Sequence, residues 1–141
     1  MKPSKILYEA KVKAIGGRDG RAESEDGSFR MPLSVPTGLG GPGGAGSNPE
    51  QLFAAGYAAC FLGAVKLVSR TRKIPLSDDT SVSAVVGIGP IDTGYILTVE
   101  LIVELPGIEP SAAQEIVAGA HERCPYSNAT RGNIDVQFTI I

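Results

Sequence analysis

The feature that most constrains this chain is a long apolar helix predicted over residues 47–70, SNPEQLFAAGYAACFLGAVKLVSR. Asn48 is a good helix N-cap, Pro49 suits the first helical position, and Glu50 favours the positive end of a helix. The middle of the stretch carries no charge, and small residues recur in it at helical spacing. We therefore expect a helix that is buried on most sides, with Cys60 in the interior of the fold.

The rest of the chain shows the alternation of apolar and polar residues that is typical of strands. Three strands are predicted before the helix, beginning at Ile6 and separated by Asp-Gly turns at 19–20 and 26–27. A hairpin, a second helix that ends before Pro125, and a final strand follow the long helix. The order βββ-α-ββ-α-β predicts an α+β fold with mostly antiparallel sheets around the central helix.

Length and composition limit the classes of function. A chain of 141 residues with 43% apolar residues predicts a single domain over residues 1–141. A net charge of −2 favours neither nucleic acid nor an anionic membrane as a partner. The N-terminus has no apolar signal-peptide core and the uncharged run is short for a bilayer, so we expect a cytoplasmic protein.

The long helix also predicts how the chain assembles. It is apolar nearly all round, and one small sheet cannot cover it. A second copy of the chain would supply the missing cover, so we expect a homodimer with the central helices inside.

The Gly-rich segment at residues 36–46, PTGLGGPGGAG, formally matches a GxGxxG nucleotide motif. No strand–turn–helix unit of the dinucleotide-binding type surrounds it, so a close-packed or flexible connection is the better interpretation.

Two cysteines, Cys60 and Cys124, are too far apart for a CxxC site. They are either inert buried thiols or a pair that the fold assembles. The sequence CPYS at Cys124 resembles the glutaredoxin motif, but Cys124 is predicted to close a helix and not to open one. His121 is the only histidine, and a surface position explains it better than a metal site.

A buried thiol in mid-helix has a raised pKa and needs a nearby cation to become reactive. Arg18, in the turn GGRDG, is the candidate, and a solvated turn arginine is the alternative. Glu50 precedes Cys60 by ten residues, which is roughly 15 Å along one helix. If both serve one site, Glu50 comes from a partner subunit or the helix is broken between them.

Three stretches together, GGRDG, NPEQLFAAGYAACF and CPYSNAT, resemble the organic hydroperoxide resistance proteins. These form a branch of the family that also holds the osmotically inducible protein C (OsmC) group, and the resemblance covers essentially the whole chain. It implies an intertwined homodimer, with two active sites at the subunit interface, that reduces organic hydroperoxides to alcohols.

The resemblance also implies the roles of four residues. Cys60 is the peroxidatic thiol that becomes a sulfenic acid, and Cys124 resolves it to a disulfide. Arg18 stabilises the thiolate, and Glu50 is the carboxylate partner of Arg18. The implied reductant is a dihydrolipoyl group on a lipoylated protein, without a tightly bound cofactor or metal. The alternatives are a peroxidase of the sister OsmC branch with another substrate preference, and a redox sensor or lipid-binding module.

Overall fold

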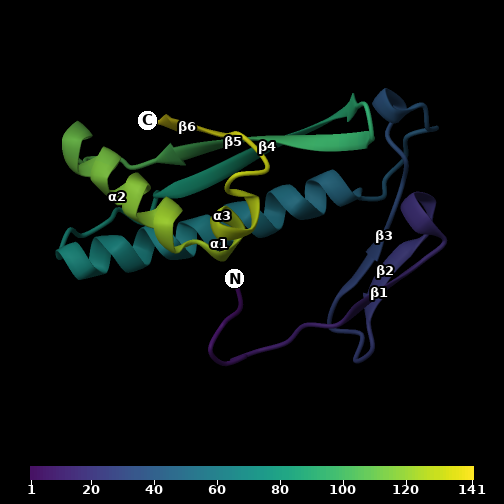
Figure 1. The fold of residues 1–141 in the computed structure, drawn as a ribbon, viewed down its shortest axis with the longest axis horizontal. Coiled ribbons are helices and arrows are strands. Elements are labelled where there is room, and N and C mark those ends of the chain that lie inside the picture. Colours follow the sequence, from purple (N-terminus) through teal and green to yellow (C-terminus); the bar gives the residue numbers. More distant parts are fainter. The chain divides into compact units, whose positions relative to one another are not determined.

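The computed structural model describes residues 1–141, and these form two compact units (Figure 1). The N-terminal unit is Met1–Pro49 and the C-terminal unit is Glu50–Ile141. Each unit has a three-stranded sheet of its own. The expectation of one domain over the whole chain stays a prediction.

The N-terminal unit is a small antiparallel meander. Its strands are β1 (Val12–Ile15), β2 (Arg21–Ser24) and β3 (Arg30–Pro32), in the spatial order β1-β2-β3. Short 3₁₀ turns lie at Gly17–Asp19 and Thr37–Leu39. Only Ala22 and Leu33 among its apolar residues are buried. The unit therefore has very little core of its own.

The first strand is shorter than the alternation predicted. β1 begins at Val12, whereas residues 6–11 are irregular and exposed, so the expected start at Ile6 is wrong. Val12 pairs with Ser24, the last residue of β2, and the chain then turns away. Residues before Val12 thus have no neighbouring strand in this unit, and an unpaired segment cannot form a ladder.

The C-terminal unit contains the remaining helices and strands. They are α1 (Pro49–Arg72), β4 (Ser81–Ile91), β5 (Gly94–Glu104), α2 (Pro110–Arg123), α3 (Pro125–Thr130) and β6 (Val136–Ile140). The sheet has the order β4-β5-β6, and α1 and α2 lie against one of its faces (Figure 1). The predicted long helix, the hairpin and the second helix are confirmed, and α3 is an additional short helix.

The last strand runs in a direction that the sequence did not reveal. β4 and β5 pair antiparallel, as expected, but β6 pairs parallel to β5. The expectation of mostly antiparallel sheets is met, and this pair is the parallel exception. The reason is the connection: α2 and α3 carry the chain back along the sheet before β6 begins, as a crossover helix does between parallel strands.

The core of the C-terminal unit lies between one side of α1, the strand β5 and the helix α2. α1 contributes Tyr57, Phe61, Val65 and Val68, which are fully or nearly fully buried. They pack in one cluster with buried residues of β5 and α2, including Val99, Leu101, Val103, Ile116 and Val117.

The opposite side of α1 is open in the single chain. Ala55, Ala59, Gly63 and Leu67 recur every four residues and are exposed. The expectation of burial on most sides is therefore not met within one chain, and we call these four residues the open side of α1.

The complete helix α1 extends beyond its uncharged run, and this added length bears on whether it could cross a membrane. Its 24 residues are long and apolar enough to cross a membrane, and 33% of its most apolar stretch is buried in this fold. The expectation made for the shorter uncharged run is not contradicted by this length, since a single helix of this kind is weak evidence for a membrane span. Core helices of soluble proteins share this length and composition.

Candidate active site

Cys60 lies in the middle of α1, within an unbroken helix, and its side chain is partly buried. It neighbours the core cluster without being enclosed by it. The thiol is therefore near apolar surroundings and also within reach of solvent in the single chain. This is a more exposed position than the sequence predicted.

Cys124 lies at the junction of α2 and α3 and is completely buried. Its backbone N–H donates to the Ala120 carbonyl at 2.8 Å, and its carbonyl accepts from the Asn128 N–H at 3.0 Å. The prediction that it closes the second helix is confirmed, since Cys124 is the C-cap of α2. Cys124 also precedes α3, so the argument that it closes a helix without opening one holds only in part.

The two thiols lie close together, although 64 positions separate them in sequence. Neither is in a disulfide, and the Cys124 side chain is close enough to Cys60 to raise the pKa of its thiol. The fold therefore assembles a cysteine pair from the middle of one helix and the junction of two others. Such nearness is what an assembled pair requires, and the redox role of the two thiols stays a prediction.

The surroundings raise the pKa of the Cys60 thiol above its ordinary value. Burial is the largest cause, because a low-dielectric environment disfavours the thiolate. The Tyr126 backbone N–H acts in the opposite direction by donating to the sulfur, while the hydrogen bond and charge of Cys124 raise the pKa further. The C-terminal unit therefore places a thiol, but does not by itself activate it.

Aromatic side chains gather beside this pair. The Tyr57 and Tyr126 rings stack with centroids 5.5 Å apart, and Phe53 meets each of them edge-on, at 6.1 Å and 5.9 Å respectively. Gly56 makes room for this arrangement, since a Cβ there would be 2.5 Å from the Tyr126 hydroxyl oxygen. The thiol thus has an apolar, aromatic wall on α1 and α3.

Three buried side chains with hydroxyl groups also connect α1 to α3. The Tyr57 hydroxyl forms hydrogen bonds with Ser127 Oγ at 2.9 Å and with Thr130 Oγ1 at 3.3 Å. All three residues are at least 97% buried. Sequence analysis missed this group, although Tyr57 precedes Cys60 by three residues and Ser127 follows Cys124 by three.

Arg18 and Glu50 lie where the local sequence placed them. Arg18 is in the 3₁₀ turn Gly17–Asp19 between β1 and β2, which begins with Gly16 and Gly17 at φ values of 79° and 68°. Such values favour glycine. Glu50 is in the first turn of α1, and the helix continues without a break to Cys60. One of the two options is thereby removed: the helix is not broken between these residues.

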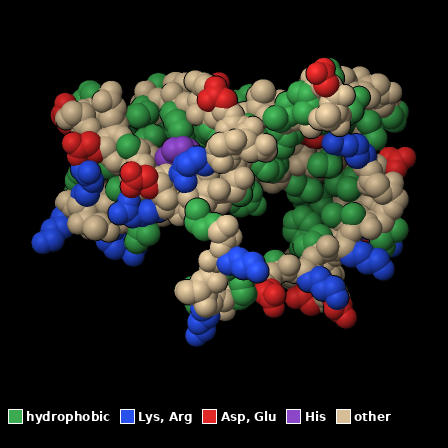
Figure 2. Space-filling model, in the orientation of Figure 1, with side chains coloured by type: hydrophobic (Ala, Val, Ile, Leu, Met, Phe, Trp, Pro, Cys, Tyr) green, Lys and Arg blue, Asp and Glu red, His purple; other side chains and the backbone are tan.

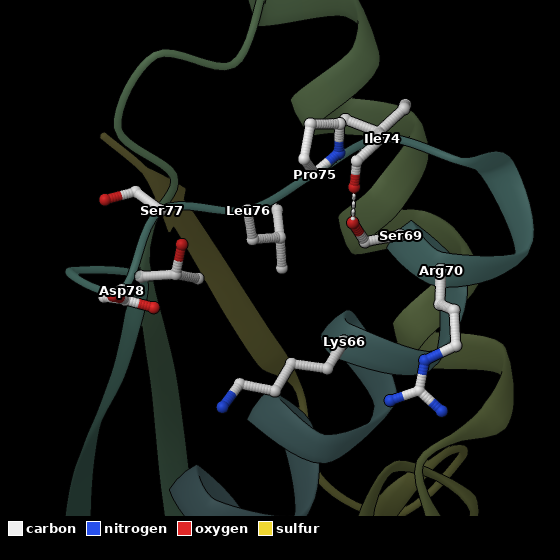
Figure 3. A pocket seen from close by; sticks show the side chains of 9 residues that line it. Lys66, Ser69, Arg70, Ile74, Pro75, Leu76, Ser77 and Asp78 are labelled. Carbon is white, nitrogen blue, oxygen red and sulfur yellow. Dashed lines mark hydrogen bonds between the residues drawn. The ribbon is translucent and has the colours of Figure 1, made fainter.

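A cavity of about 370 Å³ lies at the C-terminal end of α1 (Figure 3). Lys66 and Arg70 extend from the helix along it, and the Ser69 hydroxyl turns to the Ile74 carbonyl. Neither cysteine lines this cavity, whose lining mixes charged residues such as Lys66 and Asp78 with apolar ones. It is therefore separate from the thiol site.

His121 and the charged residues add no second site. No three His, Cys, Asp or Glu side chains lie close enough together to hold a metal ion. The His121 ring packs against Phe138 at 4.9 Å, so the residue is partly buried and not a surface histidine. On the face shown in Figure 2, basic and acidic side chains are interspersed, without a large area of one sign.

Comparison with known proteins identifies the family. The model of the family described as OsmC-like protein matches residues 41–139. This chain belongs to the OsmC-like family. The resemblance seen in the three sequence motifs is confirmed by relatives named as organic hydroperoxide resistance proteins.

One relative of this OsmC-like protein is the organic hydroperoxide resistance protein of Xanthomonas axonopodis pv. citri, 53% identical over 98% of this chain and 97% of the relative. A crystal structure of an organic hydroperoxide resistance protein OsmC from Legionella pneumophila has a TM-score of 0.91 at 47% identity, over 96% and 98% of the two chains. That of OhrB from Bacillus subtilis has a TM-score of 0.87 at 41% identity, over 96% and 100%. The α+β fold of this family is thus established for the chain.

Proposed function

We propose that this OsmC-like protein is a thiol peroxidase that reduces organic hydroperoxides to alcohols, with Cys60 and Cys124 as its redox pair. The observation that carries the proposal is the meeting of the two thiols across α1 and the α2–α3 junction. Relatives over nearly the full chain bear the name organic hydroperoxide resistance protein, which supports the substrate class.

In the first step the Cys60 thiolate attacks the outer peroxide oxygen. The O–O bond breaks, the sulfur is oxidised to a sulfenic acid, and the leaving alkoxide takes a proton to become the alcohol. Because burial raises the pKa of Cys60, this step needs a cation. We assign that role to Arg18, whose guanidinium would favour both the thiolate and the developing alkoxide.

In the second step Cys124 resolves the sulfenic acid. Its sulfur attacks the Cys60 sulfur, the S–O bond breaks, and water leaves, so that a Cys60–Cys124 disulfide forms. The reach of Cys124 to Cys60 supports this step without a large rearrangement. Rapid resolution protects Cys60 against further oxidation by a second peroxide.

The proposal places Glu50 in the site of a second copy of the chain. Ten residues of unbroken helix separate Glu50 from Cys60, so the two cannot meet in one copy. A homodimer that covers the open side of α1 brings a second Glu50 into the assembly, where it would orient Arg18. If it lay nearer the thiolate than Arg18 does, its charge would raise the pKa of Cys60.

The cycle closes when a dihydrolipoyl group of a lipoylated protein reduces the disulfide. One lipoyl thiolate attacks the Cys60–Cys124 bond, and its second thiol displaces the remaining cysteine, which leaves two protein thiols and an oxidised lipoyl ring. This dithiol is part of the proposal, as is a cytoplasmic location.

Intact mass tests the proposal directly. After one equivalent of cumene hydroperoxide, the wild-type chain is expected to lose two hydrogen atoms, and Cys124→Ser is expected to gain one oxygen. Cys60→Ser should keep its mass. Two unmodified thiols in the wild-type chain would refute the peroxidase.

Turnover separates the proposal from its alternatives. Sustained peroxide consumption with dihydrolipoamide, but not with thioredoxin, is expected for the enzyme, whereas a redox sensor would oxidise once and stop. A faster rate with cumene hydroperoxide than with hydrogen peroxide supports the organic substrate class. The opposite order would favour a peroxidase with the sister-branch preference.

A further inference from the structure

The Tyr57 hydroxyl bonds to a residue that has the same three-residue offset from Cys124 as Tyr57 has from Cys60. Tyr57 is one helical turn before Cys60 on α1, and Ser127 is one turn after Cys124 on α3. Residues three apart share a side of a helix. The hydrogen bond between Tyr57 and Ser127 at 2.9 Å therefore joins the two helices next to the place where the thiols meet.

This contact is fully enclosed. Tyr57 and Ser127 are both completely buried, so neither hydroxyl can exchange its partner for water without opening the core. Breaking a buried hydrogen bond leaves an unsatisfied polar group, which costs more than a surface bond does. The pair consequently holds α3 against α1 at a fixed spacing.

Thr130 strengthens the contact from the other end of α3. The Thr130 hydroxyl lies 3.3 Å from the Tyr57 hydroxyl. It also donates to the carbonyls of Tyr126 and Ser127, at 3.0 Å and 3.2 Å. α3 has only six residues and is too short to be stable alone. α2 holds Cys124 from its N-terminal side through the Ala120 carbonyl, and the position of α3 on the other side of Cys124 depends on what α1 provides.

We propose that Tyr57 is a positioning residue for the resolving step: its hydrogen bond to Ser127 holds Cys124 at the distance from which it attacks oxidised Cys60. This inference rests on the proposed function. Tyr57 does not touch the peroxide in this role, so it acts on disulfide formation and not on peroxide attack. The Tyr57 hydroxyl carries this positioning role, while the Tyr57 ring packs in the aromatic wall.

The test compares Tyr57→Phe with the wild-type chain at both steps. Tyr57→Phe keeps the ring and removes only the hydroxyl. Peroxide attack, followed by trapping of the sulfenic acid after mixing with cumene hydroperoxide, is expected to change less than about twofold. Disulfide formation, followed by quenching and intact mass, is expected to slow roughly three- to tenfold, the rate equivalent of one hydrogen bond.

Ser127→Ala should likewise slow disulfide formation and leave peroxide attack nearly unchanged. It replaces Tyr57→Phe in the test if Tyr57→Phe folds poorly. Because both variants remove one shared bond, the double variant should be hardly slower than either single variant. Tyr95→Phe is the matched control, since Tyr95 is an exposed tyrosine of β5 outside the site. Its two rates should equal those of the wild-type chain.

A slower resolving step has a visible consequence. Cys60 should be over-oxidised to the sulfinic acid at a lower excess of peroxide in Tyr57→Phe than in the wild-type chain. An equal slowing of both steps, or an unchanged rate of disulfide formation, would overturn the inference and leave Tyr57 a purely structural residue.

A second measurement is independent of peroxide chemistry. In glutathione redox buffers, the equilibrium between the dithiol and the disulfide reports the effective concentration of the two thiols. Tyr57→Phe should form the disulfide less readily than the wild-type chain and Tyr95→Phe. If the wild-type chain forms this disulfide with glutathione but not with hydroperoxide, the peroxidase fails and the positioning role stands. An equilibrium that Tyr57→Phe leaves unchanged overturns the positioning role alone.

Discussion

The two units of this chain differ in how they are stabilised. The C-terminal unit has a cluster of 14 buried residues around one side of α1, whereas in the N-terminal unit only Ala22 and Leu33 are buried apolar residues. The N-terminal unit nevertheless holds Arg18 in a well-formed turn, and the C-terminal unit holds both thiols. Under the proposed function, the well-packed unit supplies the redox pair and the weakly packed unit supplies its cation.

The difference teaches that stability and chemistry are divided along the chain. Buried area determines most of the free energy of unfolding, so substitutions in the core of the C-terminal unit should have the largest effects. A turn with little buried surface can change without unfolding the protein. Arg18 thus lies in the unit with the smaller buried core.

The largest expected effect is that of Phe61→Ala. Phe61 is fully buried, and its removal should lower the free energy of unfolding by about 3–5 kcal/mol. Leu33→Ala in the N-terminal unit should cost about 2 kcal/mol, at the low end for such changes, because fewer buried groups surround it. Urea denaturation at one protein concentration measures both. An equal loss from the two variants would contradict the comparison.

Smaller substitutions of buried residues test the comparison between the two units more finely. Ile116→Val removes one methylene from a fully buried side chain of α2 and should cost about 1 kcal/mol. Ile15 in β1 is only partly buried, so Ile15→Val should cost less than Ile116→Val. Thermal unfolding of the two variants, side by side, gives the order. A larger loss for Ile15→Val would mean that β1 is covered in the assembled protein.

The pH dependence of the C-terminal unit should include a contribution from His121. Burial, together with the nearby Arg131, lowers the pKa of His121 below 6.5, while Glu122 acts weakly in the other direction. The unfolded chain therefore binds the proton more readily, and stability is lost as the pH falls below about 6.5 and through the lower pKa of the folded state. His121→Gln should flatten this part of a urea-stability profile against pH. An unchanged slope would remove His121 from the explanation.

The smallest effect is expected in the N-terminal unit, at Asp26. Hydrogen bonds from Ser24 and Ser28 lower the pKa of its carboxyl from 3.8 to about 2. Its contribution is present above pH 3.8 and is lost as the pH falls through about 2. Asp26→Asn should therefore change the acid dependence of stability only below about pH 4, which thermal unfolding between pH 2 and 5 can detect. A change near neutral pH would argue against this origin.

Much of the fold could be predicted because its signals are local. Pro49 and the apolar run predicted the start of α1, and the alternation after the helix predicted the hairpin of β4 and β5. The start of β1 and the direction of β6 could not be predicted in this way, since both depend on which strand lies alongside. Alternation shows that a segment can form a strand and not that it has a neighbour.

The candidate site was predicted in the same uneven way. Cys60 and Cys124 stood out by residue type and motif, but the Tyr57–Ser127 hydrogen bond joins residues 70 positions apart, and neither side chain is unusual in its own segment. No local pattern distinguishes a core tyrosine that contacts Ser127 from one that only packs. The pair becomes visible only when α3 is placed on α1.

The sequence by itself determined that one long helix carries Cys60 in its middle and Glu50 at its start, because helix length and the rise per residue are local properties. The separation of those two residues follows from that alone. Only the tertiary structure decided that Cys124 meets Cys60, and that one side of α1 is packed while the other is open. Those outcomes depend on how α2, α3 and the sheet pack together, and contacts between distant segments leave no regular pattern in either of them.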